Sequence, residues 1–162
     1  MKSTIQKIFL TIAIICCISN PVQSMATMNN AHKENAQAYI EELNILQNQI
    51  FSLAQKVVFE QEVNMSYVKD TVKNLNKYLD TLRGKIDSDL IKDSSIENSL
   101  YMNRDLLMLD NTINYMKSAL SELSYLVNQT SGAEKIITLE RYFNFKIYAG
   151  NTLKFTKNLI GE

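Results

Sequence analysis

The chain has 162 residues, the length of one domain, with 17 basic and 17 acidic side chains and no formal net charge. A neutral chain lacks the positive field on which nucleic-acid binding depends, so we expect no nucleic-acid partner. With 4 Gly and 1 Pro, the sequence is poor in the residues that form turns. This scarcity argues against a domain of many short strands and favours a few long elements.

The first 26 residues have the order of a secretory signal peptide. Residues 1–7 carry two lysines and no acid, residues 8–18 are apolar apart from one threonine, and small residues follow Pro21. Cleavage is expected after Ser24 or after Ala26. The apolar run of 11 residues is shorter than the ~20 of a spanning helix, so a retained anchor is the weaker alternative. We therefore expect an exported protein, periplasmic or extracellular, with no stable membrane span after removal of the leader.

Both cysteines, Cys16 and Cys17, lie inside the apolar run of this leader. A lipoprotein would need a cysteine directly after a small residue at the cleavage point, and neither position fits well. The mature chain, a single domain over 27–162, then has no cysteine and must be stabilised by packing. It also loses Lys2 and Lys7, which leaves 17 − 2 = 15 basic against 17 acidic side chains, a net charge of −2.

The mature chain begins with a long amphipathic pattern. Apolar residues recur in steps of three and four over 36–57 and again over 65–86, the spacing of one helix face. Between the two runs the spacing fits a four-residue insertion, which unwinds a coiled coil without ending the helix. No Gly or Pro lies between Glu60 and Ser66. One helix over about 31–84 is therefore preferred to a break near Asn64, which would give a four-helix bundle.

A second helix is predicted over about 95–128. Gly84 and the polar stretch 87–93 mark the interruption before it, and Ser94 with Glu97 has the spacing of a capping box. Two apolar stripes follow, so this helix should be covered on more than one side and form the central element. The stripes are Leu106, Leu109, Ile113, Met116, Leu120, Leu123 and Val127, and Leu100, Leu107 and Leu126.

A third helix is predicted over about 132–158, again after a capping-box spacing, Ser131 with Glu134. Its expected core stripe is Ile136, Leu139, Phe143 and Ile147. Alternating apolar residues on either side of Gly150 leave a hairpin over 142–156 as the alternative. Helix is favoured because an isolated two-stranded hairpin is marginal in water. The fold class is thus all-α, an antiparallel bundle of three long helices, or four if the first one breaks.

No arrangement of residues points to catalysis, to a cofactor or to a metal. His32 is the only histidine, and near a helix start it is expected at the surface. Zinc sites need several His or Cys ligands, which the mature chain lacks. Asp87 and Asp89 could begin a calcium loop, but the EF-hand pattern then requires an acid at Ile91 and Gly at Lys92. We therefore expect a protein without enzymatic activity.

The unusual local feature is the aromatic C-terminal segment. Neighbouring aromatic residues cannot share one core-facing line, so Tyr142, Phe145 and Tyr148 are the candidates for a partner-binding patch. The first hypothesis is an exported helical protein that binds a partner protein or assembles with itself. The alternative is a small extracytoplasmic chaperone, or an accessory subunit of a secretion or envelope system, with an apolar groove between helices.

Overall fold

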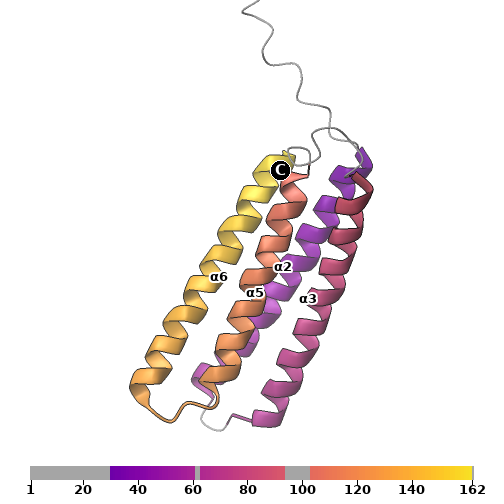
Figure 1. Cartoon of the computed structure of the whole chain (residues 1–162). Helices are drawn as coiled ribbons and strands as arrows, with labels where there is room; N and C mark the ends of the chain where they lie inside the picture. The colour runs from indigo at the N-terminus through magenta and orange to yellow at the C-terminus, as the bar shows by residue number, and fades with distance from the viewer. Residues whose placement is uncertain (1–29, 61–62, 94–102, 162) are drawn as a thin grey trace, which may run out of the picture. The chain divides into compact units, whose positions relative to one another are not determined.

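The computed structural model describes residues 30–60, 63–93 and 103–161, and the regular structure of these residues is entirely helical. Four helices pack against one another as a bundle (Figure 1). They are α2 (Asn30–Phe59), α3 (Met65–Asp93), α5 (Arg104–Leu126) and α6 (Gly132–Ile160). The predicted all-α bundle is confirmed in its four-helix form.

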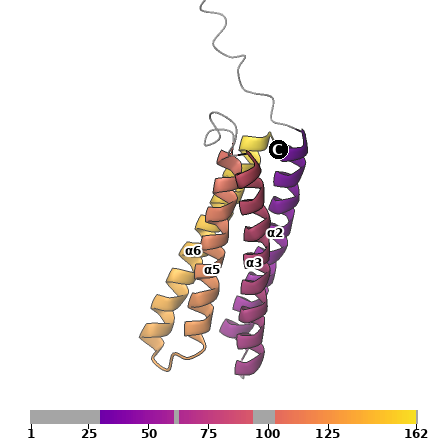
Figure 2. The same cartoon turned by 45° about the vertical axis from the view of Figure 1, so that its right-hand side comes forward.

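Contacts between helices give the order α2, α3, α5, α6 around the bundle. Tyr39, early in α2, donates a hydrogen bond to Asp89, late in α3, at 2.6 Å, so these two helices are antiparallel. Helix α5 packs on both α3 and α6. Gln47 of α2 donates to the Lys146 carbonyl of α6 at 3.4 Å and closes the ring. Figure 2 shows the α2–α3 and α5–α6 turns at the same end of the bundle, here called the turn end.

The preferred continuous helix over 31–84 is wrong, because the chain turns back near Asn64. The Asn64 side chain accepts a hydrogen bond from the Tyr67 amide at 3.0 Å, the capping contact that starts α3. A straight rod would leave much of its apolar stripe in water. Folding back buries both halves of that stripe, and no Gly or Pro is needed for the turn.

The predicted interruption at 84–93 is also wrong, since α3 continues through Gly84 and ends at Asp93. Asn103 is the N-cap of α5, so the described helix begins later than the predicted residue 95. The Ser94–Glu97 capping box and Leu100 lie outside the described residues. So do the signal peptide and both of its cysteines.

The core of α2, α3 and α5 follows the predicted stripes closely. Six of the seven predicted stripe positions of α2 are buried, and in α5 the stripe from Leu106 to Leu123 is buried throughout. Leu126 is buried as well, whereas Leu107 is exposed, so α5 is covered over a narrower arc than predicted. Helix α5 packs on both α3 and α6, but in the closed ring every helix has two neighbours, so α5 is not a central element.

Helix α6 runs without interruption past Gly150, so the hairpin alternative for 142–156 is wrong. The helix ends at Gly161, whose φ of 78° is the left-handed conformation that favours glycine. At its start Ser131 is the N-cap, but its side chain makes no capping hydrogen bond. The predicted capping box therefore marks the helix start without forming its reciprocal bonds.

Candidate functional site

Helix α6 has a different face in the core from the predicted one. Tyr142 is 1% exposed, whereas its neighbour Phe143 is 46% and Ile147 is 54% exposed. The expected core stripe through Phe143 and Ile147 is therefore wrong. The buried residues of α6 are instead Thr138, Tyr142, Ala149, Leu153, Thr156 and Ile160.

Small side chains explain this choice of face. Three of the six buried residues of α6 are Thr or Ala, and the buried face of α5 likewise includes Thr112 and Ala119. Small residues let two helix backbones approach closely, and α5 and α6 form the most closely packed helix pair in the described chain. Large residues at these positions would push the helices apart. Other large apolar residues, among them Phe143 and Ile147, are displaced to the sides of the helix, whereas the large residues Tyr142, Leu153 and Ile160 stay buried.

One set of displaced residues faces α2 and is called the α2-side flank: Ile136, Phe143 and Ile147, all exposed. Phe143 and Ile147 line an open hollow of about 500 Å³ together with Phe51 of α2. The Lys146 ammonium lies 3.5 Å from the centroid of the Phe51 ring. Gly150 also lines the hollow, and a Cβ atom there would lie in ordinary van der Waals contact, 3.5 Å, with the Gln47 amide.

The second set faces α5 and is called the α5-side flank: Ile137, Tyr148 and Phe155, also exposed. Tyr148 contacts Tyr115 of α5 with ring centroids 5.5 Å apart. The Arg104 guanidinium lies 5.3 Å from the centroid of the Phe155 ring. Between the two flanks the outer side of α6 carries polar residues such as Asn144 and Asn151. Helix α6 thus has a buried face on which small and large residues are mixed, and an apolar flank on either side of it.

Further apolar side chains gather at the turn end. Phe59, the last residue of α2, is 79% exposed, and Tyr125 near the end of α5 is also exposed. The first six residues of α6, Gly132 to Ile137, are all exposed. Both flanks of α6 therefore begin at an end of the bundle that already presents aromatic and aliphatic side chains.

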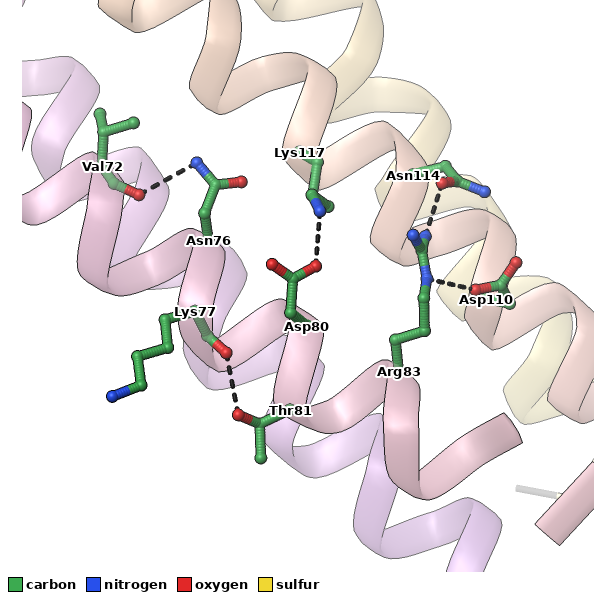
Figure 3. A network of polar contacts seen from close by, with 9 residues as sticks. All are labelled: Val72, Asn76, Lys77, Asp80, Thr81, Arg83, Asp110, Asn114 and Lys117. Carbon is green, nitrogen blue, oxygen red and sulfur yellow. Dashed lines mark hydrogen bonds and ion pairs between the residues drawn. The ribbon is translucent and has the colours of Figure 1, made fainter. Parts of the chain in front are cut away.

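The outer surface between α3 and α5 is polar by contrast (Figure 3). Arg83 of α3 bonds Asp110 of α5 at 2.7 Å and also donates to Asn114. One turn earlier in α3, Asp80 pairs with Lys117 of α5. Ion pairs this accessible to solvent contribute at most about 1 kcal/mol each, and these two link α3 to α5. Among the described residues, large apolar side chains are exposed on all four helices, and six of these fifteen lie on α6.

Tyr142, Phe145 and Tyr148, the predicted patch, do not lie on one exposed surface of α6. Tyr148 is exposed on the α5-side flank, Phe145 is half-buried, and Tyr142 lies in the core. Burial raises the pKa of Tyr142 to about 12. Its hydroxyl is buried and has no hydrogen-bond partner among the described residues. Tyr142 is therefore a packing residue, and the exposed residues Ile136, Phe143 and Ile147 were missed as surface candidates.

His32 does not lie at the surface, as its sequence context suggested. Its side chain is 11% exposed, and Nε2 lies 2.8 Å from Oδ2 of Asp105, whose side chain is 2% exposed. The pair joins the start of α2 to the start of α5. Sequence reasoning missed it because the two residues are 73 positions apart.

Asp87 and Asp89 belong to α3 and not to a loop. Asp89 accepts hydrogen bonds from Tyr39, Asn35 and Lys92. Burial acts to raise the pKa of Asp89, but these hydrogen bonds outweigh burial and lower the pKa below its ordinary value. Among the described residues no group of three or more His, Cys, Asp or Glu side chains could hold a metal ion. Asp89 is thus a structural carboxylate that joins α2 to α3.

A second hollow, of about 470 Å³, lies between α2 and α3 and is lined by Ile45, Leu53 and Tyr67 among others. The residues that line the two hollows are amides, hydroxyls, lysines and apolar side chains, without a carboxylate in either. Within the described helices none is both long enough and apolar enough to cross a membrane. Comparisons of the chain with protein-family models, with curated proteins and with solved structures give no significant match.

Proposed function

We propose that this chain is an exported protein without enzymatic activity that works by binding protein chains through the exposed flanks of α6. The observation that carries the proposal is the register of α6. Six large apolar side chains on that helix are exposed in two rows: Ile136, Phe143 and Ile147, and Ile137, Tyr148 and Phe155. Single exposed apolar residues are ordinary on a protein surface, but rows of them are typical of interaction sites.

The composition of the flanks supports this proposal. Phe143, Tyr148 and Phe155 are aromatic, and aromatic residues are enriched at the centres of protein interfaces. Arg104 and Lys146 lie over the rings of Phe155 and Phe51, at the edges of the two flanks. Arginine is enriched in the same interfaces, and a cation over an aromatic ring is attracted to it. Export follows from the leader-like residues 1–26 and is part of the proposal.

Site-specific photo-crosslinking in cells tests the binding role. A photoreactive amino acid replaces Tyr148 or Phe155 on the α5-side flank, and Lys73, an exposed residue of α3, serves as the control. We expect cross-linked adducts at 148 and 155 and none at 73. Adducts of equal yield at all three positions, or at none of them, would contradict the proposal.

A small extracytoplasmic chaperone or accessory subunit is the second candidate, and the turn end favours it. Phe59, Tyr125 and Ile137 are exposed there on three different helices. An unfolded client offers apolar segments to such a surface. If this candidate applies, the protein should delay aggregation of a reduced, unfolded client, and Phe59→Ser should weaken that effect. A client that aggregates at the same rate with and without the protein would exclude it.

A further inference from the structure

We infer that two copies of this chain pair through the α2-side flank of α6, antiparallel to one another, around a two-fold axis at Ile147. This inference rests on the proposed binding role of α6 and names the partner for one of its flanks. The partner is a second copy of this chain, because the α2-side flank of one copy is complementary to the same flank of a copy that runs in the opposite direction.

The reversal symmetry is visible in the positions of the charges. Glu140 lies seven residues before Ile147 and Lys154 lies seven residues after it, and both are exposed. Seven residues are close to two helical turns, so all three side chains project from the same side of α6. In an antiparallel pair centred on Ile147, each Glu140 faces the partner's Lys154. Among the described residues neither Glu140 nor Lys154 forms an ion pair within its own chain.

The shape of the flank has the same symmetry. Phe143 lies four residues before Ile147, and Gly150 and Asn151 lie three and four residues after it. Gly150 leaves room in the hollow beside Phe51 and Gln47. In the antiparallel pair the Phe143 ring of each copy enters the hollow of the other, and the two Ile147 side chains meet on the axis. Such an interface is isologous, the commonest type in homodimers.

The paired surface is small, because one helix flank and the adjacent side of α2 supply all of it. Interfaces at the lower end of the usual size range are weak. We therefore expect a reversible dimer with a dissociation constant on the order of 10 μM, which dissociates on dilution.

Charge reversal tests the register of the pair. The protein is produced from the full gene, so that any leader is processed naturally, and its mass is followed by sedimentation over a dilution series. The dimer contains two pairs of residues 140 and 154. Glu140→Lys or Lys154→Glu gives both pairs like charges, so each variant should raise the dissociation constant of the dimer at least about tenfold. The double variant restores both pairs and should restore the dimer. Asp87→Lys, an exposed acid of α3, has the same charge change as Glu140→Lys and should leave the dimer unchanged.

Cysteine cross-linking tests the axis. In a background with Cys16 and Cys17 replaced by Ala, Ile147→Cys places two thiols on the two-fold axis, within the distance that a disulfide requires. Oxidation should give a covalent dimer. Tyr148→Cys, the neighbouring residue on the α5-side flank, should remain monomeric under the same conditions.

A protein that stays monomeric at the highest concentration would overturn this inference. So would charge variants that dimerise like the unaltered protein, or a double variant that fails to recover. A different protein cross-linked at position 147 while the chain stays monomeric would also overturn it. The proposed function is tested separately, by cross-linked adducts at positions 148 and 155. These adducts can form whether or not the chain dimerises, so a failure of the dimer can be told from a failure of the proposed function.

Discussion

At the scale of single residues, two tyrosines make opposite use of their hydroxyl groups. The Tyr39 hydroxyl donates to Asp89 at 2.6 Å, and both burial and this bond raise the pKa of Tyr39. The Tyr142 hydroxyl is buried without a described partner. A hydrogen bond to a charged group stabilises a protein by about 1.5–3 kcal/mol, whereas a buried polar group without a partner costs about 1–3 kcal/mol.

Removing the two hydroxyls should therefore have effects of opposite sign. Tyr39→Phe should lower the free energy of unfolding by about 1–2 kcal/mol, because Asp89 loses a donor. Tyr142→Phe should leave it unchanged or raise it by about 1 kcal/mol, because the ring stays and the unpaired hydroxyl goes. Urea denaturation measures both, and each variant is the control for the other. A larger loss at Tyr142 than at Tyr39 would contradict the assignment of the two hydroxyls.

Asp89 gives the bundle a dependence on pH. Its pKa in the folded chain lies below the ordinary value of 3.8, so the carboxylate form is favoured by folding. The stability that this shift supplies is complete above the ordinary pKa and is lost as the pH falls through the folded pKa. Asp89→Asn should therefore flatten the fall in the free energy of unfolding between about pH 5 and pH 2. An unchanged slope in that variant would show that Asp89 does not contribute.

At the scale of elements, the buried stripes of α2, α3 and α5 could be predicted from the spacing of apolar residues, because the core residues of these helices recur in steps of three and four. The turn near Asn64 could not be decided in this way. Its signal is one asparagine that caps α3, and the same spacing also fits a continuous helix. The continuous helix and the helix that turns back differ in energy because they bury the apolar stripe to different extents. That burial depends on helices far along the chain.

The register of α6 could not be predicted because that helix has apolar residues on three sides. Spacing alone favours the line through Ile136, Phe143 and Ile147, in which every residue is large and apolar. The fold instead buries Ala149 and Thr156, which are small, because α5 packs closely against them. The buried face of α6 is set by how α6 fits against α5. The spacing of apolar residues along α6 alone does not show this fit.

Substitutions in α6 should reflect this fit. Ala149→Leu adds volume to a closely packed interface and should lower the free energy of unfolding by about 1–3 kcal/mol. Ile147→Ala removes an exposed side chain and should change it by less than about 0.5 kcal/mol in dilute, monomeric protein. Thermal melts followed by circular dichroism measure both. Equal losses at the two positions would argue against the register.

At the scale of the whole molecule, the bundle depends on α5, which packs against α3 and α6. Leu120 of α5 is fully buried. Leu120→Asp would place an unpaired charge in the core and should unfold the domain. Leu107→Asp, on an exposed position of the same helix, should leave the helical signal in circular dichroism unchanged. A folded Leu120→Asp variant would contradict the position of α5 in the bundle.

The proposals on binding and pairing both depend on the register of α6, which buries Tyr142 and exposes Phe143, Ile147 and Tyr148. Hydroxyl-radical footprinting of dilute, monomeric protein tests it directly, because Tyr142 and Phe143 are adjacent and chemically similar. We expect strong labelling of Phe143 and Tyr148 and protection of Tyr142. A labelled Tyr142 beside a protected Phe143 would contradict it and would restore the core stripe predicted from spacing alone.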